Sequence, residues 1–180
     1  MAIFEFTAIQ GSVLSASPLA VGSAFAMPIA ATFTITISDG DALLGGDIFR
    51  NELGDDADQV MLDDGTGAVN VRVYAERRLI VQDASGEEFT LIEIETAGNG
   101  GTQAERFYAF VGTPPAQSAA LSVIEITNAI GDVAPLAQLN GGLSFEPNAA
   151  GEIVLEAEDL LLNGFATAAD GQASGGQIVE

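Results

Sequence analysis

Alternation of apolar and polar residues dominates the middle of the chain and predicts β-strands. In residues 32–38, TFTITIS, the apolar side chains of Phe33, Ile35 and Ile37 fall on one face and the threonines on the other. Successive side chains of a strand point to opposite faces, so this pattern is typical of a half-buried strand. Similar strand-like segments follow at 60–62, 69–74, 79–82, 89–95, 107–111 and 121–126. Almost no 3.6-residue period, which would indicate helix, is present.

Turn residues separate these segments at short intervals. Asp63-Asp64-Gly65-Thr66-Gly67 and Asp83-Ala84-Ser85-Gly86 are strong turn signals, and the segments 98–101 and 114–115 supply further breaks. Short strands joined by glycine-rich turns are characteristic of antiparallel sheets. The sequence therefore predicts an all-β fold, an antiparallel β-sandwich or barrel.

Four segments are expected along the chain. Residues 1–31, rich in Ala, Ser and Pro, predict an N-terminal arm whose first residues could form an edge strand. Residues 32–127 hold the β-sandwich domain, and residues 128–152 are interpreted as a linker with few charges. Residues 153–180 look like the opening strands of a second module.

Acidic residues set the charge of the chain. Twenty-six Asp and Glu stand against five Arg and no Lys, which gives a net charge of −21. Such a charge repels phosphate backbones and anionic lipid surfaces, so nucleic-acid binding and membrane-surface binding are not expected. The hydrophobic content of 48% still allows a substantial core.

Missing residue types narrow the chemistry further. The chain has no Cys and no His, which excludes disulfides, thiolate or imidazole metal ligands and the usual catalytic triads. It has no Trp, the strongest sugar-stacking side chain. Residues 6–38 carry no charge, but no basic residue precedes them and prolines interrupt them, so neither a cleavable signal nor a membrane span is expected.

An acidic loop is the first candidate metal site. Asp39, Asp41 and Asp47 lie among glycines, and flexible oxygen-rich loops suit Ca²⁺. The spacing does not match a known calcium loop. The favoured alternative is a solvated acidic loop that keeps the protein soluble.

Glu156 and Glu158 form the second candidate site, because alternate strand residues share a face and could meet one cation. The segment Glu156-Ala157-Glu158-Asp159, with 173–176 (ASGG), resembles the opening edge of β-sandwich carbohydrate-binding modules. That resemblance implies a structural Ca²⁺ held by Glu156 and Glu158, with the remaining ligands supplied elsewhere. The alternative is an exposed polar face of an edge strand.

A second resemblance covers the central region. The segments TFTITISDGDALLGGD (32–47), VYAERRLIVQDASGEEFTLIEIE (73–95) and FYAFVGTPP (107–115) are similar to β-rich N-terminal modules of type I-secreted proteins of marine α-proteobacteria. Those proteins often carry calcium-binding repeats or autoprocessing modules. The resemblance implies secretion to the extracellular space or cell surface, and it implies no particular activity.

Carboxylate pairs and aromatic residues are the remaining candidates. Glu93 with Glu95, or Glu87 with Glu88, could serve as glycosidase carboxylates, which act as a pair across a cleft. The favoured alternative places Glu93 and Glu95 on the solvent face of a strand, paired with Arg72, Arg77 or Arg78. Two further residues, Tyr74 and Tyr108, are the choice for ligand binding if any aromatic side chains are exposed.

These observations favour a protein that is not an enzyme. The expected function is a non-catalytic extracellular structural or adhesive protein that forms a homo-oligomer or larger assembly by strand exchange. The alternative is the carbohydrate-binding accessory region of a larger secreted enzyme or adhesin, with a polysaccharide partner.

Overall fold

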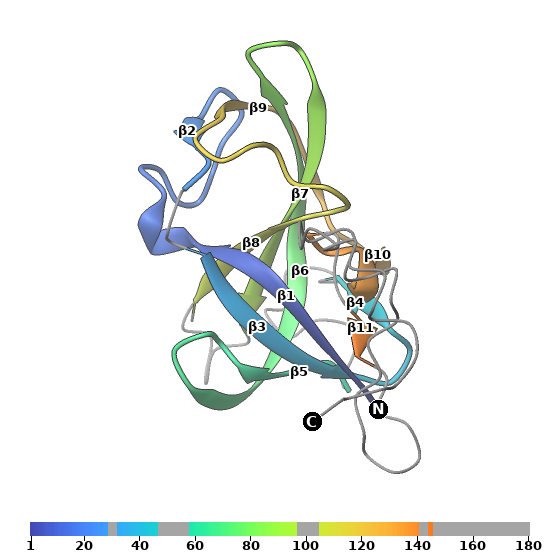
Figure 1. Cartoon of the computed structure of the whole chain (residues 1–180). Coiled ribbons are helices and arrows are strands. Elements are labelled where there is room, and N and C mark those ends of the chain that lie inside the picture. The colour runs from blue at the N-terminus through green and yellow to red at the C-terminus, as the bar shows by residue number, and fades with distance from the viewer. Residues whose placement is uncertain (29–31, 47–57, 97–104, 141–143, 146–180) are drawn as a thin grey trace, which may run out of the picture. The chain divides into compact units, whose positions relative to one another are not determined.

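The computed structural model describes residues 1–28, 32–46, 58–96, 105–140 and 144–145, and the described chain is almost entirely β-structure (Figure 1). Its elements are, in chain order, β1 (Ala2–Gln10), η1 (Gly11–Val13), β2 (Ala24–Ala26), β3 (Thr32–Asp39), β4 (Leu43–Gly45), β5 (Val60–Asp63), β6 (Ala68–Asp83), β7 (Glu88–Thr96), β8 (Arg106–Phe110), β9 (Ala120–Asn128), β10 (Asp132–Pro135), η2 (Leu136–Gln138) and β11 (Ser144–Phe145).

Six strands close into an antiparallel barrel, which confirms the predicted fold class. Their order is β6-β5-β3-β1-β8-β7, and β7 pairs with β6 to complete the circle. Closure gives each barrel strand a paired neighbour on both sides along at least part of its length. β9 and β2 extend the sheet from one side of β6, and β4 pairs with β10 in a separate two-stranded sheet.

The barrel is filled by alternate residues of all six strands. One cluster of buried apolar side chains includes Phe4, Phe6, Ile35, Ile37, Met61, Val73, Ile92, Ile94, Phe107 and Ala109. The alternation in the sequence therefore identifies the inward face correctly for most of these strands.

β6 serves two partners on the same edge. Its first half pairs with β5 and its second half pairs with β9, with a register shift on its β7 side between Ala75 and Arg77. Between these two pairings, the buried side chain of Gln59 links β6 to β4. Its amide nitrogen donates to the Val73 carbonyl at 2.7 Å, and its amide oxygen accepts from Gly45 N–H at 2.9 Å. These bonds replace ladder hydrogen bonds that the strands do not make there.

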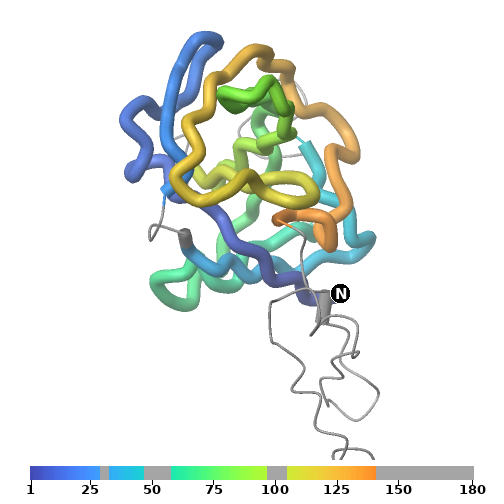
Figure 2. The backbone as a smooth tube through the Cα atoms, turned by 45° about the horizontal axis from the view of Figure 1, so that its top comes forward, coloured from blue at the N-terminus to red at the C-terminus, as the bar shows by residue number. Residues whose placement is uncertain are grey.

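A second core lies on the other face of β7 and β8. Leu91, Tyr108 and Phe110 pack there against Leu14, Leu19 and Phe25 of the N-terminal segment, with Leu121 and Val123 of β9. β2 pairs with the beginning of β9, and Figure 2 shows the two chain segments running side by side.

The segment boundaries differ from those expected. Residues 1–31 are not a separate arm, because β1 is a barrel strand and β2 extends the sheet. Within residues 128–152, β10 and η2 bring Val133, Leu136 and Leu139 into the barrel core, so this stretch is not only a linker. The chain divides into compact units Met1–Glu146 and Pro147–Glu180, and the second lies outside the described residues. In the described part, no helix has the length and apolar character that a bilayer crossing requires.

Candidate functional site

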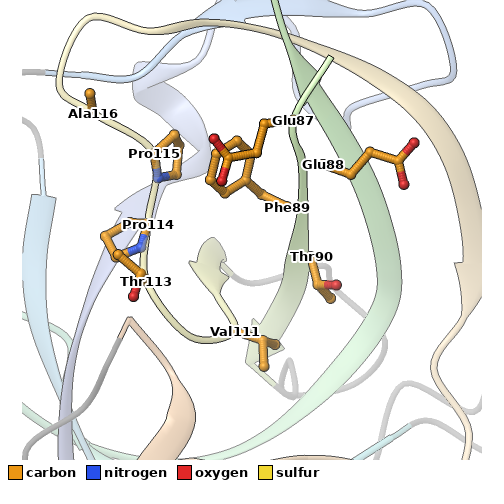
Figure 3. A pocket seen from close by; sticks show the side chains of 9 residues that line it. All are labelled: Glu87, Glu88, Phe89, Thr90, Val111, Thr113, Pro114, Pro115 and Ala116. Atoms are coloured by element: carbon orange, nitrogen blue, oxygen red, sulfur yellow. The ribbon is translucent and has the colours of Figure 1, made fainter. Parts of the chain in front are cut away.

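A groove opens where β7 and β8 separate (Figure 3). The two strands pair from Leu91 to Glu95, and Val111 N–H donates to the Thr90 carbonyl at 2.9 Å just beyond. The chain then leaves β8 through a proline-containing loop that leads to β9. Between them lies a cavity of about 400 Å³, lined by Glu87, Glu88, Phe89, Thr90, Val111, Thr113, Pro114, Pro115 and Ala116. We call it the β7–β8 groove.

The walls of the β7–β8 groove combine carboxylates, hydroxyls and apolar rings. Glu87 and Phe89 face Pro115 across the groove, whereas Glu88 projects to the other side of β7 (Figure 3). The Phe89 ring is held edge-on against Phe110, with ring centroids 6.3 Å apart. Because Pro115 is buried and Phe89 is half-buried, the apolar wall is supported from behind by the second core.

The β6–β7 turn fixes the start of the groove's β7 wall. The Asp83 carboxylate accepts hydrogen bonds from the hydroxyl and the N–H of Ser85 and from Glu87 N–H, at 2.7 to 2.9 Å. The Ser85 hydroxyl bond is the largest cause that lowers the pKa of Asp83, followed by the bond from Glu87. Gly86 takes a positive φ of 90°, which the turn requires and which glycine adopts without strain. Asp83 thus stays ionised and anchors the backbone of Glu87.

A buried ion cluster lies farther along β7. Glu93 is only 1% exposed. Its Oε2 accepts a hydrogen bond from Arg77 Nε at 3.1 Å, and its Oε1 forms an ion pair with Arg106 Nε at 2.9 Å. Glu95 contacts Arg106 and accepts the Tyr74 hydroxyl at 3.3 Å. The two negative charges of the carboxylates are therefore offset by the two positive charges of the guanidinium groups. Burial opposes the charge of Arg106, but Glu95 and then Glu93 outweigh it and raise the pKa of Arg106.

Burial of this cluster corrects the expectation that Glu93 and Glu95 line a solvent face. Arg77 is a partner as expected, but the second arginine is Arg106, which lies on the neighbouring strand β8 directly opposite Glu95. The reason is that the N-terminal segment passes over this face of β8. Gly11 lies so close to Arg106 that an added Cβ would be 3.2 Å from the Arg106 Cβ.

The two tyrosines are buried, so neither offers the exposed ligand-binding surface considered for Tyr74 and Tyr108. Tyr74 belongs to the ion cluster through Glu95. The Tyr108 oxygen accepts Leu19 N–H at 3.3 Å and forms a hydrogen bond with Ser17. Aromatic strand residues of this kind pack in the core and find a partner for their hydroxyl. The exposed-aromatic interpretation fails because residues 14–27 supply a second core that alternation alone does not reveal.

Tyr108 makes folding sensitive to alkaline pH. Burial, followed by the nearby Glu93 charge, raises the pKa of Tyr108 above the value of 10.0 of an unfolded tyrosine. The folded state then holds the phenolic proton more tightly. The contribution of Tyr108 to the free energy of unfolding is therefore constant below about pH 10 and is lost as pH rises through the raised pKa. In a Tyr74→Phe variant the remaining tyrosinate absorbance should appear above the ordinary range. Adding Tyr108→Phe to that variant should remove the loss of stability above about pH 10. If Tyr108 in the folded protein titrates with the pKa of a free tyrosine, the expectation is wrong.

The proposed metal ligands divide between described and undescribed residues. The buried Asp39 carboxylate accepts Gly40 N–H at 2.7 Å and Leu43 N–H at 3.1 Å, and Asp41 also accepts Leu43 N–H. Both residues therefore organise the turn before β4. Among the residues that the structure describes, no group of three or more carboxylates is arranged to hold a metal ion. Asp47, Glu156 and Glu158 lie outside the described residues.

The β7–β8 groove is not predicted as a site from the sequence, although the glutamates and prolines that line it are visible there. Glu87 and Glu88 were considered only as a catalytic pair, and Pro114-Pro115 only as a strand break. Adjacent strand residues point to opposite faces, so Glu87 and Glu88 do not form a pair across a cleft. Comparison with protein-family models, with curated proteins and with solved structures found no match to the chain.

Proposed function

We propose that this chain is a non-catalytic module of an extracellular structural or adhesive protein, and that its β7–β8 groove binds a neutral polysaccharide. The observation that carries the proposal is the combination of the Glu87 carboxylate, the Thr113 hydroxyl and a supported Phe89–proline wall around one cavity of about 400 Å³. Small-molecule sites combine apolar surface with a few placed polar groups. The lining of this groove is predominantly polar, and the Phe89 and proline rings supply its apolar surface.

Charge selects the class of ligand. The chain carries −21 overall, and exposed glutamates line the groove, so anionic ligands are repelled. Sugar hydroxyls can donate to an ionised carboxylate, and such charge-assisted bonds are about twice as strong as neutral ones. The Phe89 and Pro114 rings offer apolar surface for the C–H faces of a sugar ring. A neutral polyhydroxylated chain satisfies both surfaces.

Binding fits the described carboxylates better than hydrolysis does. Glycosidases use two carboxyl groups that flank the scissile bond about 5–10 Å apart, one with a raised pKa. Glu87 and Glu88 are neighbours that point to opposite sides of β7. Glu93 and Glu95 are buried and engaged by arginines, so a glycosidic oxygen has no route to them.

Extracellular placement rests on composition and on the two resemblances. A chain without Cys and with a strongly acidic surface suits an oxidising, calcium-rich exterior. Calcium is kept as part of the proposal at two separate candidate sites, the acidic loop that contains Asp47 and the pair Glu156 and Glu158. Each binding measurement is therefore made with added Ca²⁺ and with a chelator.

Affinity electrophoresis through gels that contain a soluble polysaccharide tests the proposal. At least one neutral glucan or galactan is expected to retard the protein, whereas anionic alginate is not. Glu87→Gln should weaken binding about tenfold or more, because a hydrogen bond to a charged group contributes about 1.5–3 kcal/mol. Glu5→Gln, at an exposed position on β1, is the matched control with the same charge change. Failure of all neutral polymers, or equal retardation of Glu87→Gln and wild type, would overturn the proposal.

A further inference from the structure

The outer edge of β9 is only partly covered. β2 pairs with Ala120, Leu121 and Ser122, and Val123 exchanges hydrogen bonds with Ser23 and Gly22 at 2.9 Å. From Ile124 to Asn128, β9 continues along β6, but no described segment pairs with its other side (Figure 1). Open strand edges of this kind are templates for pairing with another chain.

Backbone groups on this edge point outward at known positions. Ala129 N–H donates to the Glu76 carbonyl at 3.1 Å, so residue 129 faces β6. The backbone N–H and C=O groups of successive strand residues point to alternate sides. Those of Thr127 therefore also point toward β6, whereas those of Ile126 and Asn128 point away from it.

Apolar side chains gather along the same edge. Val21 is 63% exposed and precedes Gly22, which is bonded to β9. Ile124 is 41% exposed within the open segment, and Ile130 is 65% exposed just past its end. The segment 124–130, IEITNAI, holds one charge and none of the lysines or prolines that commonly protect an edge.

We propose that a second copy of this chain pairs with this edge, β9 against β9, in an antiparallel two-fold dimer. Identical antiparallel strands form a self-complementary interface in which the same residues meet from both sides. With the two-fold axis at Ile126, Ile126 lies opposite Ile126 of the second copy. Glu125 then lies opposite Thr127 of the second copy, so the two Glu125 carboxylates are not opposed.

Charge complementarity supports this register. Arg78 is exposed and lies directly opposite Thr127 on β6, so the two side chains share a face. One guanidinium nitrogen of Arg78 donates to the Val133 carbonyl at 2.5 Å, and its other N–H groups remain for a contact with a second copy. In the dimer, Glu125, Thr127 of the second copy and Arg78 of the second copy would lie in a row on the same face of three neighbouring strands. The Cα atoms of Glu125 and that Arg78 would be about 10 Å apart, which is two strand spacings. Both side chains are long enough to meet across that span. Two such contacts, related by the two-fold axis, would offset part of the repulsion between copies of charge −21.

Light scattering on the full chain, without polysaccharide, tests the dimer. The expected result is a shift from monomer to dimer between about 5 and 500 μM, favoured at about 0.5 M over 0.15 M NaCl because salt screens the net repulsion. Larger assemblies in place of a dimer, or monomer throughout at the higher salt, would overturn the proposal.

Variants separate the edge from other surfaces. Asn128→Pro removes an outward N–H without touching the β6 ladder and should weaken the dimer at least tenfold, whereas Asn128→Ala should not. Glu125→Arg should also weaken it, and the double variant Arg78→Glu/Glu125→Arg should restore it. Circular dichroism confirms that each variant is folded. Undiminished dimerisation of folded Asn128→Pro would contradict pairing through β9.

Discussion

Replacing Glu93 by glutamine is expected to lower the free energy of unfolding by about 3 kcal/mol or more. Glu93 is almost fully buried and bonds Arg77 through one oxygen and Arg106 through the other. Removing one partner of a buried ion pair typically costs about 3–5 kcal/mol, because the remaining charge stays buried without compensation. The low end applies here, since both arginine side chains keep some contact with solvent.

Urea unfolding followed by circular dichroism measures this cost. Glu5→Gln is the matched control, because it makes the same change at an exposed site, where substitutions usually shift stability by less than about 0.5 kcal/mol. Replacing both members of a pair, as in Glu93→Leu/Arg77→Leu, should cost less than Glu93→Leu alone, since no uncompensated charge is left at that contact. A Glu93→Gln protein as stable as wild type would show that the cluster contributes nothing to folding.

Local pattern predicts the strands of this protein well. The alternation of Phe33, Ile35 and Ile37 identifies the inward face of β3. Ile35 and Ile37 are fully buried in the barrel core, and Phe33 is half-buried. The turn at residues 83–86 falls at the β6–β7 hairpin, where Asp83 and Gly86 form it. These features depend on neighbouring residues and are therefore readable from sequence.

Partners far apart in sequence are not readable in the same way. Alternation at Phe4 and Phe6 indicates a strand, but it does not show that β1 closes the barrel by pairing with β8, about one hundred residues away. Glu93 and Glu95 alternate with isoleucines as surface residues do, yet they are buried, and Gly11 of the N-terminal segment lies against their partner Arg106. The β7–β8 groove depends on the same long-range contacts, because the loop after β8 forms its second wall.

The N-terminal strand provides the largest expected effect. β1 pairs with β3 over eight residue positions and with β8 at its other edge, so it completes the barrel. Phe4, Phe6, Ala8 and Ile9 on this strand are all buried. An arm that docked only peripherally, as the sequence suggested, could be removed at little cost, but a closing strand cannot.

Deletion of residues 1–10 is therefore expected to abolish cooperative folding. Truncating a buried phenylalanine typically costs about 3–5 kcal/mol, and the deletion removes Phe4 and Phe6 together. That loss, with the opened strand edges, matches or exceeds the total stability of about 5–15 kcal/mol that domains usually have. Thermal unfolding followed by circular dichroism should show no sigmoidal transition. Deletion of residues 147–180, which belong to a separate compact unit, is the control and should leave the melting temperature of the barrel nearly unchanged. A cooperative transition in the protein that lacks residues 1–10 would show that β1 is not required to close the barrel.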